Sequence, residues 1–321
     1  MRTSSAIVAL ALCAAISERS DAQTGPQTLQ HSATMGHDDI TPLAEVTVIG
    51  EPSDPSMPDL ILVPGIGLSW HVWEPWMERN ADRFRMHAVT LPGMAGTEPP
   101  PTPTDEDGAT PWLHNAADAI ARYIEHADLD RPIVIGHGTG GMAALHTGTR
   151  HPELVRAYAS ITMPAAFPID RRPVTRGERL DYAYNFVQTR NAELGEAEAR
   201  AQLSRIYAAS APIGPVRDAA LVAAVRCEPH VLTQYWTEVV ATDLVAEIAA
   251  LETLPVLICL PLQGSFPRQP ERWHAIADAC DAMLLVEFSG SASFCHEDEP
   301  ERFMRSLDAL IARAERYSDD R

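Results

Sequence analysis

The segment from 133 to 148, IVIGHGTGGMAALHTG, has the residue types and spacing of a catalytic turn. A buried strand runs into a helix there, and Gly136, Gly140 and Gly141 leave room for a sharp bend between them. A bend of this kind presents the residue at its tip as a nucleophile for attack on a carbonyl carbon, and that residue is normally a serine. The tip of this segment is Gly138, which has no side-chain oxygen or sulfur. The pattern therefore predicts the place of a nucleophile but supplies none.

Short apolar runs alternate with amphipathic segments on both sides of this turn. Apolar residues recur at helical spacing in segments such as 70–84, 113–124 and 300–315. Repeated strand-helix units predict an α/β fold with a mainly parallel sheet that is flanked by helices on both faces. The runs that we expect to form strands are 59–65, 85–93, 131–136, 155–162, 254–260 and 282–288.

The first 44 residues differ in composition from the rest of the chain. Arg2 precedes an uncharged run from Ala6 to Ile16, and a polar stretch follows that ends at Ala22. This order is typical of a cleaved secretory signal peptide, so we expect residues 1–22 to be removed and the chain to be exported to the periplasm or the extracellular space. Residues 23–44 are rich in Gln, Thr, Ser and Gly without apolar periodicity, which indicates a linker.

Beyond the linker, the alternation of strands and helices is interrupted once. Residues 164–251 contain Ala-, Glu- and Leu-rich helical stretches, such as GEAEARAQLSRIYAAS, but no convincing strand. We therefore expect a core made of residues 45–163 and 252–316, with a helical cap formed by residues 164–251.

The composition restricts the partners and cofactors of the chain. Its formal net charge is −19 over 321 residues, which argues against nucleic acid and anionic membranes as partners. The four cysteines after residue 22 form no Cys-x-x-Cys pair, and no histidine spacing points to zinc, so we expect no metal and no cofactor. Cys259 lies inside an apolar run and is expected to be a buried free thiol, although an oxidising compartment would allow one bridge.

Four stretches taken together resemble the α/β-hydrolase family with a helical cap, in particular its lipase- and esterase-like small-molecule members. They are VPGIG at 63–67, LPGMAGTEPP at 91–100, GHGTGG at 136–141 and CHEDEPERF at 295–303, and the resemblance extends from about Val46 to Ala314. The resemblance implies the fold of that family and a serine-histidine-acid triad whose nucleophile lies at position 138. It also implies that the backbone amides of Ile66 and Thr139 form an oxyanion hole.

The other two triad positions implied by the resemblance also lack the expected side chains. In the loop after the last strand, Ser293 takes the place of the histidine base, and His296 follows three residues later as a poor substitute. The acid is expected after one of two strands, where the chain has Thr162 or Gly264. The first carboxylate after Thr162 is that of Asp170, well beyond the expected site.

We interpret these substitutions as the loss of the triad as a unit, because triad members act together and contribute little to the rate once one is gone. The sequence then predicts a secreted pseudoenzyme that keeps a small-molecule pocket. Its ligand is expected to be a small apolar molecule with a carbonyl or carboxylate group, held by the oxyanion-hole amides. The pocket residues that we expect are Gly65, Ser69, His71 and His137.

Other interpretations of the same residues remain open. A hydrolase of the carboxylic ester type can use unusual groups such as His296 or Asp170 with a bound water. Cys295 beside His296 is a weaker nucleophile-base pair because adjacent residues rarely point at each other, and the run from His296 to Asp298 lacks a second cluster of metal ligands. A structural or partner-binding role, and an engineered inactive form of an ordinary hydrolase, also fit these residues. The sequence carries no signal for an oligomeric state.

Overall fold

The computed structural model describes residues 42–101, 111–163, 175–189, 195–243, 248, 254–264 and 270–319. The expected signal peptide and most of the expected linker lie outside these ranges, and so does Asp170. Cleavage, export and any role of Asp170 therefore stay predictions.

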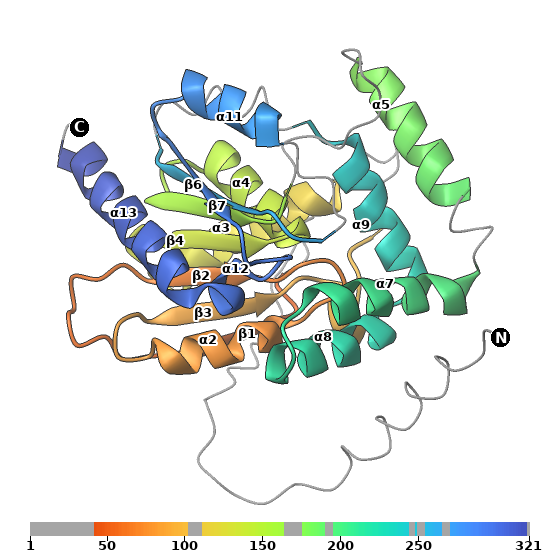
Figure 1. Ribbon diagram of the computed structural model, residues 1–321, viewed down its shortest axis with the longest axis horizontal. Coiled ribbons are helices and arrows are strands. Elements are labelled where there is room, and N and C mark those ends of the chain that lie inside the picture. Colours follow the sequence, from red (N-terminus) through yellow and green to blue (C-terminus); the bar gives the residue numbers. More distant parts are fainter. Residues whose placement is uncertain are drawn as a thin grey trace, which may run out of the picture.

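A seven-stranded sheet forms the centre of the described chain, with the strand order β1-β3-β2-β4-β5-β6-β7. All neighbouring strands run parallel except β1, which is antiparallel to β3. The mainly parallel sheet flanked by helices confirms the predicted fold class (Figure 1). The strands are β1 (Glu45–Ile49), β2 (Leu60–Val63), β3 (Met86–Thr90), β4 (Ile133–His137), β5 (Ala157–Ile161), β6 (Val256–Pro261) and β7 (Met283–Phe288).

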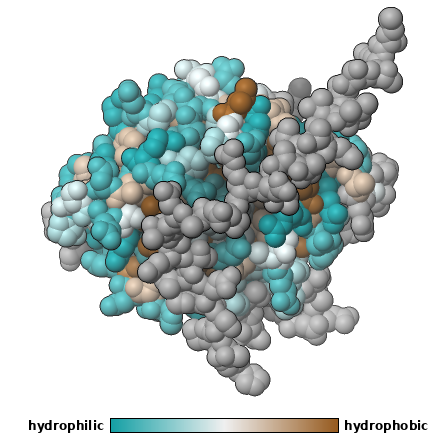
Figure 2. All heavy atoms as spheres, turned by 90° about the horizontal axis from the view of Figure 1, so that it is seen from below, coloured by the Kyte–Doolittle hydropathy of each residue, from teal (hydrophilic) through white to brown (hydrophobic). Residues whose placement is uncertain are grey.

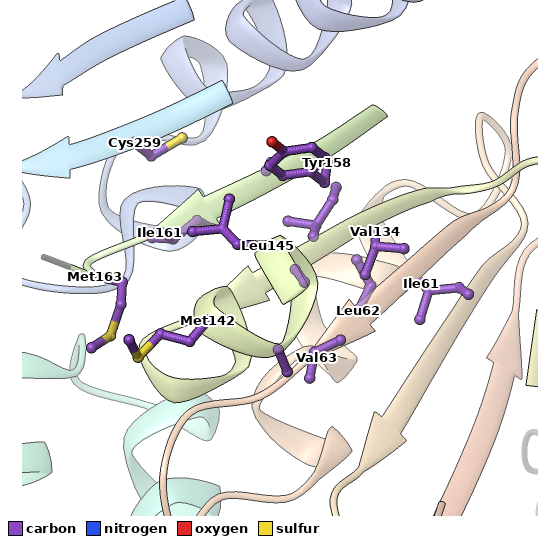
Figure 3. Close-up of a cluster of buried hydrophobic side chains, with 14 of the residues drawn as sticks. Ile61, Leu62, Val63, Val134, Met142, Leu145, Tyr158, Ile161, Met163 and Cys259 are labelled. Carbon is purple, nitrogen blue, oxygen red and sulfur yellow. The ribbon is translucent and has the colours of Figure 1, made fainter. Parts of the chain in front are cut away.

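The central strands are buried along their whole length because both faces of the sheet are covered. Every residue of β2, β4, β5 and β6 is buried. These strands therefore appear in the sequence as mainly apolar runs and not as alternating apolar and polar residues. Figure 3 shows side chains of these strands meeting apolar side chains of the helix that follows β4. Among the labelled residues of this cluster are Ile61, Leu62, Val63, Val134, Met142, Leu145, Tyr158 and Ile161.

Helices follow the strands as the sequence predicts, with one difference. The stretch 70–84 forms a short 3-10 turn, η1 (Trp70–Val72), and then a six-residue helix, α2 (Glu74–Arg79), instead of one long helix. Pro75 lies in the first turn of α2, where its missing N–H breaks continuity with η1, and the side chain of Asn80 donates a hydrogen bond to the carbonyl of Trp76 at the other end. The remaining core helices are η2 (Met94–Gly96), α3 (Trp112–His126), α4 (Thr139–Arg150), α11 (Pro270–Ala279), α12 (Cys295–Asp298) and α13 (Pro300–Asp319).

The segment between β5 and β6 is helical in nearly all of its described residues. Its helices gather on one side of the sheet, at the right of Figure 1, and α8 contacts both η1 and η2. Their division from the core into a separate cap stays a prediction. They are α5 (Arg176–Ala183), the π-helical turn η3 (Tyr184–Gln188), α7 (Glu196–Ser210), α8 (Pro215–Arg226) and α9 (Pro229–Ala241).

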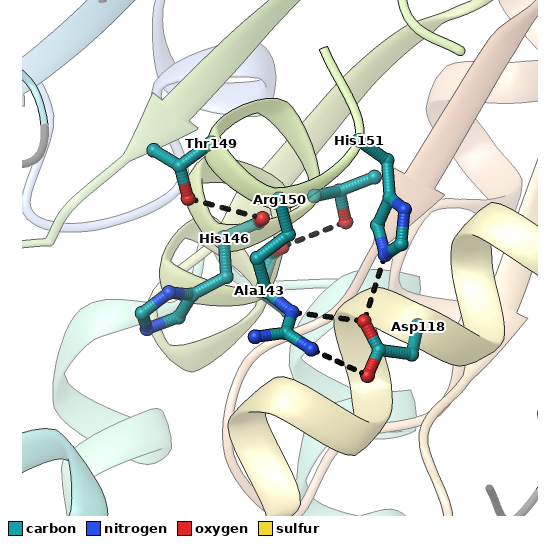
Figure 4. A network of polar contacts seen from close by, with 7 residues as sticks. Asp118, Ala143, His146, Thr149, Arg150 and His151 are labelled. Atoms are coloured by element: carbon teal, nitrogen blue, oxygen red, sulfur yellow. Dashed lines mark hydrogen bonds and ion pairs between the residues drawn. The ribbon is translucent and has the colours of Figure 1, made fainter. Parts of the chain in front are cut away.

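An ion-pair network holds α4 against α3 (Figure 4). The carboxylate of Asp118 on α3 accepts two hydrogen bonds of 2.8 Å from Arg150 and one of 2.7 Å from Nε2 of His151. Burial raises the pKa of Asp118, but the contacts with Arg150 and His151 outweigh burial, and the net pKa is lowered. The network fixes the C-terminal end of α4, the helix whose first turn starts beside Gly138.

The cysteine side chains lie inside the described structure. Cys227, Cys259, Cys280 and Cys295 are buried and form no disulfide, which confirms the free thiol expected for Cys259. The coloured part of the face drawn in Figure 2 is mainly hydrophilic, with separate small hydrophobic areas. Among the described helices, none combines the length and the apolar composition that a membrane span requires.

Candidate functional site at the carboxyl edge of the sheet

Gly138 occupies the sharp turn between β4 and α4. Its backbone has φ 54° and ψ −123°, a conformation that residues with side chains rarely adopt. The N–H of Gly138 donates to the carbonyl of Ile161 at 2.8 Å, and its own carbonyl accepts from the N–H of Gly141 at 2.8 Å. A Cβ atom at position 138 would have one neighbour within 4 Å, the Cα of Gly65 at 3.6 Å. Backbone strain, and not lack of space, therefore sets the cost of a side chain here.

The glycines around this turn allow α4 to pack directly on the sheet. A Cβ atom at Gly136 would lie 2.0 Å from the carbonyl oxygen of Gly140, and one at Gly140 would lie 2.4 Å from the carbonyl oxygen of Pro64. A Cβ atom at Gly141 would lie 2.3 Å from the hydroxyl of Ser160. These distances are too short for any side chain, which confirms the tight strand-helix packing through small residues that the sequence predicts.

The loop after β2 is held by a residue of α7. The hydroxyl of Tyr207 donates a hydrogen bond of 2.6 Å to the carbonyl of Ile66, and the N–H of Leu68 closes the loop onto the carbonyl of Gly65 at 3.1 Å. Tyr207 is buried, and burial raises its pKa, so the hydroxyl keeps its proton. Sequence reasoning missed Tyr207 because it is 141 residues from Ile66 and belongs to a helical stretch without a recognisable motif.

Two backbone amides were predicted to form an oxyanion hole. Thr139 is the first residue of α4, so its N–H has no partner within the helix. The contact with Tyr207 holds the peptide of Ile66 and thereby the loop that carries the second amide. The pairing of these two amides on one ligand oxygen stays a prediction.

His137 and Ser293 are in direct contact. Nε2 of His137 lies 3.0 Å from the hydroxyl of Ser293, and the ring of His137 stacks on Phe294 with 4.3 Å between centroids. Burial lowers the pKa of His137 to about 4, although a hydrogen bond with the backbone of Ser293 opposes this shift, so the ring is neutral at pH 7. Its Nδ1 is buried without a hydrogen-bond partner in the described part of the chain, and a Cβ atom at Gly65 would lie 2.8 Å from it.

Thr162 joins the same cluster from the end of β5. Its backbone has a positive φ of 67°, and its hydroxyl donates a hydrogen bond to the carbonyl of Ser293. The structure thus brings together Gly65, His137, Thr162 and Ser293, each of which follows or ends a parallel strand. Carboxyl ends of parallel strands meet at one edge of a sheet, which is where α/β folds bind ligands. The contact between His137 and Ser293 was missed because only the fold brings residues 156 positions apart together.

His296 has the surroundings of a packed aromatic ring. Its side chain is fully buried and stacks on Trp73 with 4.3 Å between centroids, and Phe303 also contacts it. Both ring nitrogens lack hydrogen-bond partners among the described residues, and burial holds its pKa well below the usual value. The adjacent Cys295 is buried as well, and burial raises its pKa to about 12, so it is a thiol and not a reactive thiolate.

The remaining predicted positions lie elsewhere in the described structure. Gly264 is exposed beyond the end of β6, with φ 83°. The hydroxyl of Ser69 is 3.1 Å from Nδ1 of His71, so these two residues contact each other. Ser69 is buried, whereas His71 is exposed and stacks on Trp70.

The acidic run before α13 is used in local contacts. Glu297 forms an ion pair with Arg79 at 2.7 Å, and Asp298 and Glu299 accept hydrogen bonds of 2.7 Å from the Ser291 hydroxyl and the Gly290 N–H. Within the described ranges, no group of three or more His, Cys, Asp or Glu residues is arranged to hold a metal ion.

The fold is that of an α/β protein with a candidate site at the carboxyl ends of the strands. Comparison with known proteins identifies its family. The chain belongs to the alpha/beta hydrolase family, whose sequence model matches residues 60–306. The predicted family is therefore confirmed.

Two curated relatives share one name, pimeloyl-[acyl-carrier protein] methyl ester esterase. The protein from Edwardsiella ictaluri is 24% identical over 259 residues, which cover 75% of this chain and 89% of that protein. The protein from Vibrio vulnificus is 29% identical over 117 residues, which cover 36% of this chain and 40% of that protein. The match to the Vibrio protein thus spans less than half of its length.

Solved structures show the same fold at low sequence identity. E-2-(acetamidomethylene)succinate hydrolase has a TM-score of 0.60 and 22% identity, over 84% of this chain and 94% of that chain. A hydrolase from Oleispira antarctica has a TM-score of 0.63 and 14% identity, over 83% and 94% of the two chains. A serine-to-glycine variant of the N-acyl homoserine lactonase AidH, complexed with N-hexanoyl homoserine lactone, has a TM-score of 0.59 and 14% identity, over 85% and 96%.

Proposed function

We propose that this chain is a non-hydrolytic member of the alpha/beta hydrolase family that binds a small apolar molecule through a carbonyl or carboxylate group. The observation that carries the proposal is Gly138, at the strand-helix turn where the family places its nucleophile. The turn has the strained backbone that normally presents a nucleophile, but its residue has nothing with which to attack.

The partners of the missing nucleophile support the same proposal. At the expected base position, Ser293 offers a hydroxyl and a carbonyl, and the carbonyl accepts a hydrogen bond from Thr162, one of the two candidate acid positions. The other candidate acid position is Gly264. None of these side chains can act as the imidazole or the carboxylate of a triad. The loss of all three together fits a site whose members contribute little to the rate once one is gone.

The binding groups of the proposed pocket are those of the backbone. The amide of Thr139 and the amide of Ile66 would donate to one ligand oxygen, with the Tyr207 contact holding the Ile66 peptide in place. Esterase names among the curated relatives and the acyl lactone in the AidH variant suggest an acyl compound as the ligand class.

The alternative of an ester hydrolase that uses His296 is less well supported. The ring of His296 is fully buried between Trp73 and Phe303, and its lowered pKa makes it a weak base. Asp170, the other group considered, lies outside the described residues. We also propose that the chain is exported, on the pattern of its first 22 residues, and the N-terminal sequence of protein recovered from the producing cells tests this.

Turnover tests the non-hydrolytic part of the proposal. The substrates are p-nitrophenyl acetate, butyrate and octanoate. After the release in buffer alone is subtracted, we expect the released p-nitrophenol never to exceed one equivalent of protein. His296→Ala and His274→Ala, a buried and an exposed histidine, should behave like the parent. Sustained release that scales with protein concentration and disappears in His296→Ala would show that the alternative is correct.

Binding tests the role of the backbone amides. We expect hexanoate to bind in isothermal titration, and Thr139→Pro to weaken it about tenfold because proline lacks the N–H yet is tolerated at the first position of a helix. Thr139→Ala keeps the amide and should bind like the parent. Equal affinity of all three proteins, or no hexanoate binding to any, would contradict the amide site.

A further inference from the structure

The contact between Ser293 and His137 joins a hydroxyl group to a neutral imidazole. Oγ of Ser293 lies 3.0 Å from Nε2 of His137, within the hydrogen-bonding reach that a nucleophile and its base require. Both side chains are almost completely buried, with 7% and 3% of their surfaces exposed. The pair lies away from solvent, and its chemistry depends on how the two groups are held.

The two residues stand in exchanged positions relative to the family arrangement. The resemblance places a serine at 138 and a histidine at 293, whereas here the imidazole comes from 137, one residue before the turn, and the hydroxyl comes from 293. Both groups lie at the carboxyl edge of the sheet beside Gly65, at the loop that carries Ile66. The pair thus occupies the place of the family's catalytic centre with its components reversed.

The surrounding contacts orient the pair. Stacking on Phe294 fixes the plane of the imidazole, and the hydrogen bond from Thr162 fixes the peptide of Ser293. When Nε2 accepts the Ser293 proton, the ring proton is on Nδ1, which faces Gly65 without a partner in the described structure. The base is therefore oriented by packing, and the contacts that the structure describes give it no carboxylate.

We propose that an activated ester transfers its acyl group once to Ser293, so that the protein captures the acyl group covalently. A bond forms between Ser293 Oγ and the carbonyl carbon, while the bond from that carbon to the leaving oxygen breaks. The hydroxyl proton passes to Nε2 of His137 and from there to the departing alkoxide or phenoxide. The products are an ester of Ser293 and a free alcohol or phenol.

Release of the acyl group should be much slower than its capture. Hydrolysis of the Ser293 ester requires a water molecule next to a buried imidazole, and the resulting imidazolium has no carboxylate contact among the described residues. In serine hydrolases with an intact triad, loss of the correctly oriented acid lowers kcat about 10⁴-fold. Capture from a p-nitrophenyl ester is less affected because the leaving group needs no general acid. This inference goes beyond the proposed function and is compatible with the absence of turnover.

Intact-protein mass spectrometry after incubation with p-nitrophenyl acetate tests the proposal. The sequence contains no lysine, so the usual background of acetylated ε-amino groups is absent. We expect one acetyl group, located by peptide mapping on Ser293, in the parent and in Ser306→Ala, which removes a serine hydroxyl of equal burial on α13. Ser293→Ala should remain unmodified, and Ser293→Cys, which restores a nucleophile, should be acetylated again.

The pH profile separates a base from a structural partner. Acetylation of the parent should be constant from pH 8 down to about pH 5 and fall as His137 is protonated near its pKa of about 4. His137→Gln should slow acetylation at least tenfold at pH 7. An unmodified parent, or equal acetylation of Ser293→Ala, would overturn this inference alone. Sustained turnover would overturn the proposed function, so the two failures can be distinguished.

Discussion

Gly138 shows how one residue can separate the geometry of an active site from its chemistry. Its φ of 54° lies in the region that favours glycine, and the space beside its Cα is open except for Gly65. A serine would therefore fit by volume but would hold a strained backbone, which costs about 1–3 kcal/mol. Glycine removes that strain, which is the direction of change expected where the attacking side chain is no longer needed.

Gly138→Ser should accordingly destabilise the protein by about 1–3 kcal/mol and lower its Tm, because serine cannot adopt φ 54° without strain. Thermal and urea unfolding of the two proteins measure the difference. Gly177→Ser is the matched control, since Gly177 is exposed on α5, a Cβ atom there would have no neighbour within 4 Å, and serine favours a helix over glycine. An unchanged or higher Tm for Gly138→Ser would mean that the turn is not strained.

At the scale of elements, the sequence pattern predicted the strands and helices whose positions depend on local interactions. The apolar runs of β2, β4, β5 and β6 are continuous because both sheet faces are covered, so their places could be read directly. The helix expected over 70–84 is shorter because Pro75 interrupts the backbone hydrogen bonding, a signal present in the sequence but outweighed by the apolar spacing.

The contacts that complete the site could not be predicted in the same way. The hydrogen bond from Tyr207 to Ile66 and the contact of His137 with Ser293 join residues 141 and 156 positions apart. Neither pair has a spacing or a motif that marks it, since each depends on where α7 or the loop after β7 settles on the sheet. Position 138 could be located because its signal, the flanking glycines, is local.

Tyr207→Phe tests whether α7 positions the loop after β2. Loss of the 2.6 Å hydrogen bond leaves the partly buried carbonyl of Ile66 with one fewer donor, so we expect a loss of about 1 kcal/mol in unfolding free energy. Hexanoate binding should weaken as well, because the Ile66 peptide is less firmly held. Tyr184→Phe, at an exposed tyrosine of the same helical segment, should change neither quantity. If Tyr207→Phe has the unfolding free energy and the hexanoate affinity of the parent, the loop after β2 does not depend on α7 for its position.

At the scale of the whole molecule, burial lowers the pKa values of three of the described histidines and favours their neutral form. Burial lowers the pKa values of His87 and His137 to about 4 and holds that of His296 well below the usual value. In the unfolded chain each ring has the ordinary value of 6.5. The unfolded state therefore binds protons between pH 6.5 and pH 4 that the folded state does not, and stability must fall as the pH decreases through this window.

His87 and His137 should each lower the unfolding free energy by about 2 kcal/mol between pH 7 and pH 5, as follows from a pKa that drops from 6.5 to about 4. Urea unfolding at the two pH values measures the change for the whole protein, in which carboxyl groups with raised pKa values, such as that of Glu238, contribute with the opposite sign. His87→Gln removes one titrating ring while keeping a polar partner for the hydroxyl of Tyr123, so this variant should lose about 2 kcal/mol less than the parent over the same interval. His274→Gln, at an exposed ring, should lose as much as the parent. If His87→Gln and the parent lose stability equally, the lowered pKa of His87 in the folded state would be wrong.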